Sequence, residues 1–136
     1  MKLLDTTFLI HYYFDTPGAT RYKEDHDYEF RTLSINVKEF LVAHTLEKDS
    51  PMMMSDFQQE FGFLQIEPYR KQFSFEAAQI EANLRNNGEY KYKCEEDSSF
   101  PADILIGGAA RDLQSDIVTR NIGDYDIMPS VSVDQY

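Results

Sequence analysis

Residues 1–13 of the chain read MKLLDTTFLIHYY, and the interpretation of the whole sequence starts from this segment. Residues 2–4 form a short apolar run that predicts a buried strand almost at the first residue. Thr6 and Thr7 are suited to cap the helix that the following apolar residues predict. Asp5 stands at the junction of strand and helix, where an acidic side chain either caps the helix or belongs to a functional site.

Beyond this segment, short apolar stretches alternate with longer helical patterns. Strands that alternate with helices are typical of βαβ units, so the pattern predicts an α/β fold with a mostly parallel central sheet. A length of 136 residues fits one domain, and we expect residues 1–136 to form it. The expected strands are 2–4, 33–35, 63–66, 117–119 and 131–133, and the expected helices are 8–13, 19–30, 36–47, 52–61, 74–87 and 102–113. Residues 89–101 lack periodicity and end in a proline, so they are expected to form a loop.

The chain is strongly acidic, with 24 acidic and 13 basic residues and a formal net charge of −11. A surface of this charge repels nucleic-acid phosphates, which argues against binding by simple phosphate neutralisation. Such a surface suits cations and basic partners instead.

Cys94 is the only cysteine, so no internal disulfide can form, and the chain fits a reducing compartment. We expect its thiol to be inert and on the surface, because no histidine is near it in the sequence. The longest run of apolar and glycine residues, 104–110, is too short to span a bilayer. These features predict a cytoplasmic protein without membrane contact.

Four carboxylates stand where the pattern predicts burial or the end of a strand. Asp5 ends the first strand, Glu39 lies in the helix after the second strand, Asp103 begins a helix, and Asp124 follows the strand 117–119. Ligands of parallel α/β sheets bind beyond the carboxyl ends of the strands, so these side chains are expected to converge there.

Converging carboxylates repel each other unless a cation lies among them. Mg²⁺ or Mn²⁺ prefers oxygen ligands, which fits a group of Asp and Glu side chains without Cys or His. Such an ion can hold a phosphodiester, ionise a water molecule and stabilise the leaving oxygen. A nucleic-acid substrate is therefore compatible with the negative charge once a metal ion is bound.

The sequence resembles the PIN-domain ribonucleases in four segments that occur in the expected order. The segments are LLDTTFLI (3–10), LSINVKEFLVA (33–43), ADILIGGAARDL (102–113) and IVTRNIGDYDIMP (117–129). AAQIEANLRNNG (77–88) also resembles the helix that usually precedes the third aspartate of this family. Each motif alone is weak, but the four together cover nearly the whole chain.

This resemblance implies a three-layer α/β/α sandwich and a divalent-metal-dependent endoribonuclease. Small prokaryotic members of the family are most often VapC-type toxins of toxin–antitoxin pairs. The implied partners are an RNA substrate, a second copy of the chain in a homodimer, and a small antitoxin whose basic residues enter the acidic site. Asp5, Glu39, Asp103 and Asp124 fall on the catalytic, metal-binding acids of the family, with Mg²⁺ or Mn²⁺ as the implied ion, and Thr6, Thr119 and Asn121 fall on its supporting polar positions.

Simpler interpretations of the same residues stay open. Asp5 alone fits a helix cap, and Asp103 fits the first turn of a helix, where a negative charge favours the dipole. Glu39 alone fits an exposed helix residue, and only the apolar Ala43 and Leu46 on its helix face argue otherwise.

Two other functions compete with the nuclease. One is a catalytically weak or inactive PIN-fold module that binds or processes RNA, although all four acids are present. The other is a phospho-acceptor receiver domain, which needs an acidic pair at the first strand and a lysine late in the chain. Asp5 stands alone at the first strand, and no lysine follows Lys93, so the receiver domain is disfavoured.

Overall fold

Five strands and eight helices make up the structure of residues 1–136, which is a computed structural model. The strands are β1 (Lys2–Leu4), β2 (Phe30–Leu33), β3 (Leu64–Glu67), β4 (Asp116–Thr119) and β5 (Val133–Gln135). The helices are α1 (Thr6–Tyr13), α2 (Pro17–Asp25), α3 (Ser34–Lys48), α4 (Met54–Glu60), α5 (Lys71–Asn86), α6 (Lys91–Glu96), α7 (Phe100–Leu113) and α8 (Ile122–Asp126).

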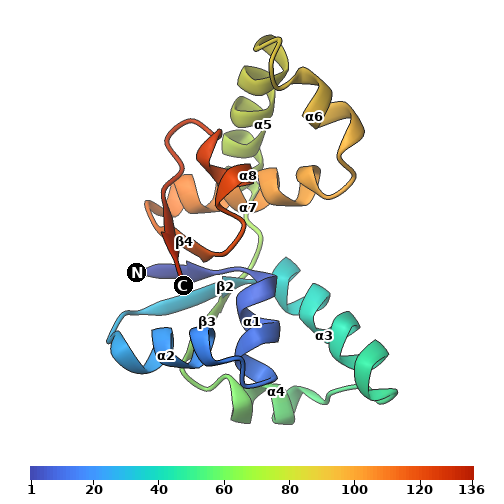
Figure 1. The fold of residues 1–136 in the computed structure, drawn as a ribbon, viewed down its shortest axis with the longest axis vertical. Coiled ribbons are helices and arrows are strands. Elements are labelled where there is room, and N and C mark those ends of the chain that lie inside the picture. The colour runs from blue at the N-terminus through green and yellow to red at the C-terminus, as the bar shows by residue number, and fades with distance from the viewer.

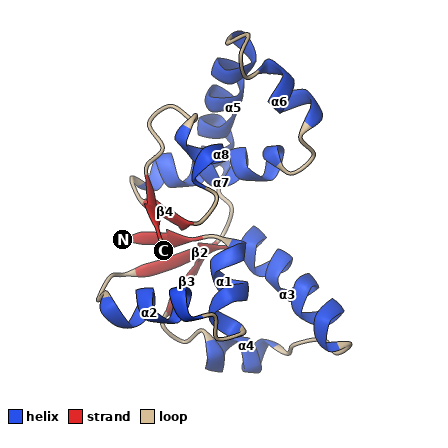
Figure 2. Cartoon of the chain, viewed as in Figure 1, coloured by secondary structure: helices blue, strands red, loops and turns tan.

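The strands form one sheet in the order β3-β2-β1-β4-β5, and every neighbouring pair is parallel. Helices α1 to α4 lie on one side of this sheet and α5 to α8 on the other (Figures 1 and 2). The predicted α/β/α sandwich with a parallel sheet is confirmed. None of the helices combines the length and the apolar character that crossing a membrane requires.

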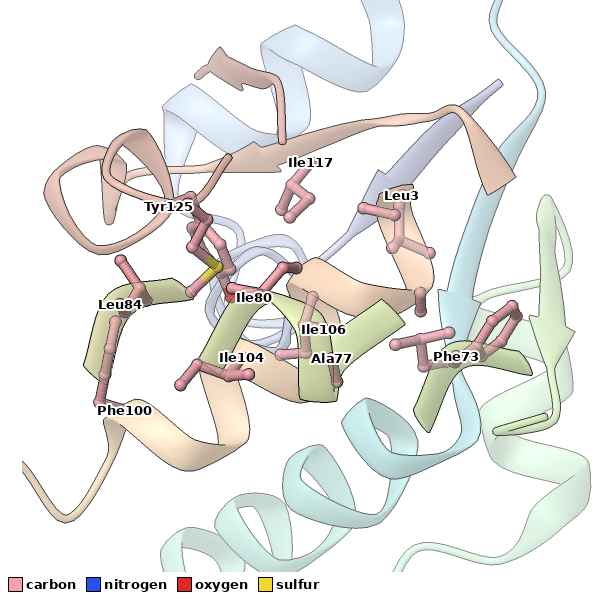
Figure 3. Close-up of a cluster of buried hydrophobic side chains, with 14 of the residues drawn as sticks. Leu3, Phe73, Ala77, Ile80, Leu84, Phe100, Ile104, Ile106, Ile117 and Tyr125 are labelled. Carbon is pink, nitrogen blue, oxygen red and sulfur yellow. The ribbon is translucent and has the colours of Figure 1, made fainter. Parts of the chain in front are cut away.

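Successive residues of the central strands point into two separate cores. Leu3 and Ile117 belong to the core beneath α5 and α7, whereas Leu4 and Val118 belong to the core beneath α1 and α3. Figure 3 shows the first of these cores, with Leu3 and Ile117 facing side chains of the helices. Burial on both faces explains why the central strands β1 and β4 contain the consecutive apolar pairs Leu3-Leu4 and Ile117-Val118 without polar alternation.

The order of the strands brings the ends of β1 and β4 together. From β1 the chain proceeds outward through β2 to β3, and it then returns to place β4 on the other side of β1. Leu4 pairs with Val118, so Asp5 and Thr119 stand side by side at the carboxyl edge of the sheet. This change of direction is the position at which parallel α/β sheets bind ligands.

The prediction is wrong in the region between the first two strands. Helix α2 ends at Asp25, and the strand predicted at 33–35 is β2, which ends before Ser34 starts α3. Ile35 is β-branched and suggested a strand, but it lies in the first turn of a helix. The other predicted elements agree with the observed ones to within three residues at each end.

The loop predicted for 89–101 is also wrong, as is the surface position of Cys94. Residues Lys91–Glu96 form α6, and Cys94 is buried in the core beneath α5 and α7. A helix of six residues is too short to show periodicity, which also explains why the short α8 was missed. Pro101 does not end a loop but stands in the first turn of α7, where its missing N–H has no partner to lose.

Gly108 allows α7 to pack directly against the backbone of α5. A Cβ atom at this position would lie 2.6 Å from the backbone N of Ala77 and 2.7 Å from the carbonyl oxygen of Phe73. Because backbone atoms cannot move aside as a side chain can, the two helices need glycine here. This contact positions the whole of α7, including Asp103.

We therefore expect Gly108→Ala to lower the free energy of unfolding by roughly 1–3 kcal/mol, the usual cost of overpacking a core. The matched control is Gly123→Ala, since a Cβ atom there meets nothing within 4 Å. Because Gly123 lies in a helix, Gly123→Ala should raise the free energy of unfolding by up to about 1 kcal/mol. Urea denaturation of the two variants measures both values, and a wild-type midpoint for Gly108→Ala would contradict the proposed helix contact.

Candidate functional site

Asp5 lies at the centre of the candidate site and is buried, with 5% of its surface exposed. It is the N-cap of α1, and its Oδ1 accepts a hydrogen bond of 2.8 Å from the backbone N–H of Phe8. The prediction that Thr6 and Thr7 cap this helix is wrong, because both residues lie inside the first turn of α1. Oδ2 of Asp5 accepts a second hydrogen bond, of 2.6 Å, from the hydroxyl of Thr119. Asp5 is thus a helix cap and a member of the polar cluster at the end of β4.

Glu39 approaches Asp5 from α3. Burial raises the pKa of the Asp5 carboxyl, its two hydrogen bonds oppose this shift, and the negative charge of Glu39 adds to it. Glu39 is half-buried, but the reason given for its burial is wrong, since Leu46 on the same helix face is 79% exposed. Its position after β2, rather than its neighbours on the helix, brings Glu39 near the site.

Asp103 and Asp124 lie next to each other, on α7 and α8. The side-chain amide of Asn121 donates to Oδ2 of Asp124 at 2.8 Å and to Oδ2 of Asp103 at 3.4 Å. The hydroxyl of Tyr125 donates to Oδ1 of Asp103 at 3.3 Å. Burial raises the pKa of Asp103 to about 7, and the adjacent Asp124 contributes to that shift.

Thr119 connects the two parts of the cluster. Its hydroxyl group donates a hydrogen bond to Asp5, and the hydroxyl oxygen accepts one of 2.9 Å from the backbone N–H of Asn121. Asn121 in turn binds Asp103 and Asp124, so a chain of hydrogen bonds leads from Asp5 to the second pair of acids. The charge of Asp5 also acts on Asp103, which places these acids within electrostatic range of each other.

A lysine contacts this cluster from α6. Nζ of Lys93 lies 2.5 Å from Oδ1 of Asp124, and this is the only ion pair that any of the four predicted acids makes. Burial acts to raise the pKa of Asp124, but the hydrogen bonds from Lys93 and Asn121 outweigh burial and leave that pKa below its usual value.

Thr6 is held by an asparagine that the sequence analysis did not single out. The side-chain amide of Asn36, on α3, donates a hydrogen bond of 2.9 Å to the hydroxyl of Thr6. Asn36 is fully buried, and its Oδ1 has no hydrogen-bond partner. A buried carbonyl oxygen without a donor is costly, so this atom is available to a bound cation or water molecule.

A depression of about 430 Å³ lies where α3 and α7 meet. It is lined by Ser34, Ile35, Lys38, Glu39, Ala102 and Leu105. Since Ala102 precedes Asp103 directly, this depression places Glu39 on one wall and the start of α7 on the other.

Comparison with known proteins gives matches to solved structures only, because the sequence matches no family model and no curated protein. The fold is similar to that of DNA-bound VapBC from Salmonella typhimurium, with 18% identity over 99% of this chain and 98% of that chain and a TM-score of 0.75. FitAcB from Neisseria gonorrhoeae gives 16% identity over 98% and 97% of the two chains and a TM-score of 0.75. A toxin–antitoxin complex from Klebsiella pneumoniae gives 20% identity over 98% and 97% and a TM-score of 0.67.

The chain has the PIN fold. The similarity extends over nearly the full length of both chains in each comparison. At identities of 20% or less, it establishes the fold of this PIN-fold chain and not its activity.

The oxygen atoms of the candidate site are of the chemical types that bind a hard divalent cation. They are carboxylates, hydroxyls and one unpartnered amide oxygen, which are the ligand types of Mg²⁺ and Mn²⁺. The positive charge that already lies against Asp124 is consistent with a site that attracts cations. As the side chains stand, however, no group of three or more His, Cys, Asp or Glu surrounds a common position for a metal ion.

Sequence reasoning missed Lys93, Asn36 and Tyr125 as members of the site. Asn36 could have been found, since it stands one helical turn before Glu39 and shares its side of α3. Tyr125 directly follows Asp124 and is almost fully buried. Lys93 gave no signal, because it belongs to a segment without periodicity.

Thr119 holds a buried carboxylate, so we expect Thr119→Val to lower the free energy of unfolding by about 1–3 kcal/mol, the cost of leaving buried polar groups unpaired. The control is Thr45→Val, which removes a half-buried hydroxyl that bonds only to the carbonyl of Leu41 in its own helix. That change should cost less than about 0.5 kcal/mol. If chemical denaturation showed equal losses of unfolding free energy for the two variants, the hydrogen bond from Thr119 to Asp5 would contribute no more than an ordinary helix hydroxyl.

Proposed function

We propose that this PIN-fold chain is a divalent-metal-dependent endoribonuclease that cleaves RNA phosphodiester bonds, and that it acts in the cytoplasm as the toxin of a toxin–antitoxin pair. The observation that carries the proposal is the hydrogen-bonded chain from Asp5 through Thr119 and Asn121 to Asp103 and Asp124. These hydrogen bonds lie at the change of strand direction, which is where parallel α/β sheets bind ligands.

In this proposal Asp5, Glu39, Asp103 and Asp124 bind Mg²⁺ or Mn²⁺. The bound ion supplies charge stabilisation for the phosphodiester and lowers the pKa of a water molecule. Thr119 orients the carboxylate of Asp5, and Asn121 orients the other pair of aspartates. The hydroxyl of Tyr125 and the amide of Asn36 support the site from the two sides of the sheet.

The net charge of −11 is compatible with an RNA substrate only if cations offset it locally. The depression between α3 and α7 contains Lys38 next to Glu39, so a phosphate group bound there meets a positive side chain. The remaining acidic surface disfavours tight, non-specific binding of RNA away from the site.

The second candidate is a PIN-fold module that binds RNA without cleaving it. It is favoured by the absence of three acids around a common ion position and by the lysine that already contacts Asp124. The two functions differ in one measurable property, which is cleavage of RNA in the presence of divalent metal.

We expect Asp5→Asn to reduce Mn²⁺- or Mg²⁺-dependent cleavage of RNA by at least about a hundredfold, since even residues behind a metal ligand cost 10–100-fold on removal. The fold should persist, because asparagine caps a helix as well as aspartate does. The assay follows degradation of a labelled total-RNA pool, with and without a chelator, while circular dichroism checks the fold.

The matched control is Asp126→Asn, which removes an exposed carboxylate two residues beyond Asp124. It should cleave at the wild-type rate. Millimolar Mn²⁺ should also raise the melting temperature of the wild type and of this control, but not that of Asp5→Asn, because ligands that bind only the folded state stabilise it. Wild-type cleavage by Asp5→Asn would overturn the proposed site, and a wild type that binds RNA without cleaving it would favour the binding module.

The proposed partners are a small antitoxin with basic residues and a second copy of the chain in a homodimer. The similar solved structures are complexes of toxins with antitoxins, which supports the first partner. An arginine or lysine of the antitoxin should enter the acidic cluster, compete with the metal ion and inhibit cleavage. Inhibition that persists after all basic residues of the antitoxin's C-terminal segment are replaced would contradict this mode of binding.

A further inference from the structure

The side chain of Lys93 reaches the site from α6, a helix that one buried residue holds in place. The next residue, Cys94, is buried in the core beneath α5 and α7, and it is the only buried residue of α6. Nζ of Lys93 lies 2.5 Å from Asp124, 3.5 Å from Asp97 and 4.8 Å from the centre of the Phe100 ring. An ammonium group with these three partners is confined, unlike that of a free surface lysine.

Both oxygens of the Asp124 carboxylate are in use. Oδ1 contacts Lys93, and Oδ2 accepts the hydrogen bond from Asn121. A divalent cation can bind Asp124 in two ways. It either displaces one of these donors or binds directly beside the positive charge of Lys93. Lys93 is the donor that repels such an ion, whereas the neutral amide of Asn121 does not.

We propose that Lys93 is a built-in counter-cation of the acidic cluster, which holds Asp124 until a divalent metal ion displaces it. This inference rests on the proposed metal-dependent function. Lys93 is then a positioning residue that acts through Asp124 and sets the metal concentration at which the site fills. Filling the site breaks the ion pair that ties α6 to α8, so metal binding loosens α6.

Lys93→Met tests this proposal, because methionine retains an unbranched apolar stem and removes the charge. The matched control is Lys91→Met, which removes the same charge from an exposed position of the same helix. Both variants change the formal net charge from −11 to −12, so any general effect of charge on cation binding is equal in the two. Lys93→Arg, which keeps a positive charge, serves as the conservative variant.

Titration with Mn²⁺, followed by calorimetry and by electron paramagnetic resonance of the free ion, measures the dissociation constant without using activity. We expect Lys93→Met to bind Mn²⁺ about tenfold more tightly than Lys91→Met, which corresponds to the lower end of the loss of one hydrogen bond between charged groups. Lys93→Arg should bind nearly as the wild type does. Circular dichroism verifies that each variant is folded, and Lys93→Gln replaces Lys93→Met if methionine prevents folding.

Amide hydrogen exchange gives an independent measurement. Mn²⁺ should accelerate exchange in residues 91–96 of the wild type and of Lys91→Met, whereas in Lys93→Met exchange there should already be fast without the ion. Equal or weaker binding by Lys93→Met, when the wild type binds Mn²⁺, would overturn the role of Lys93 alone. If no variant and no wild-type protein binds Mn²⁺, both this inference and the metal-dependent nuclease fail.

Discussion

The hydrogen bond between Thr119 and the buried carboxylate of Asp5 joins the parts of this molecule that carry its candidate site. A buried carboxylate is unfavourable unless donors surround it, and here the donors come from the first turn of α1 and the last residue of β4. The Phe8 donor is local to the start of α1, but the Thr119 donor is in place only because β1 pairs with β4 so that Leu4 lies beside Val118. A shift of this register by one residue would replace Thr119 by Val118 or Arg120 and leave the carboxylate without its hydroxyl partner. The pairing of two short strands therefore determines whether the site exists.

The acidic cluster also has to remain folded when no cation is bound. The structure reduces the repulsion among its carboxylates in three different ways. Burial beside another carboxyl raises the pKa of Asp103 to about 7, so near neutral pH part of the population carries a proton there. Asp124 receives an ammonium group from Lys93 and an amide hydrogen bond from Asn121. Asp5 receives two donors of its own. These partners explain how the carboxylates stay close together. They also explain why the carboxylates do not point toward one common position for an ion.

Topology made part of this site predictable from the sequence. Asp5 and Asp124 each follow a recognisable strand and Thr119 ends one, and the carboxyl ends of neighbouring parallel strands must meet at one edge. The prediction of burial for Glu39 used Leu46, which is exposed, so the half-buried position of Glu39 has another cause than the one predicted. The sequence also placed the second strand too late, because Ile35 has a strand-forming side chain in a helical turn. Local propensity was overridden there by packing, as it commonly is.

Lys93 could not be predicted, and the reason is physical. Its helix, α6, has six residues and one buried side chain, so neither periodicity nor an apolar run marks it in the sequence. The same properties leave α6 with little buried anchorage, and it lies far from the sheet in Figure 1. Segments with few buried contacts open at low free-energy cost, whereas the ends of β1 and β4 are fixed by the sheet. A ligand that competes for Asp124 therefore displaces Lys93 more readily than it displaces groups fixed by the sheet. The carboxylates are positioned by the fold, whereas the one positive charge among them comes from a short helix that can open locally.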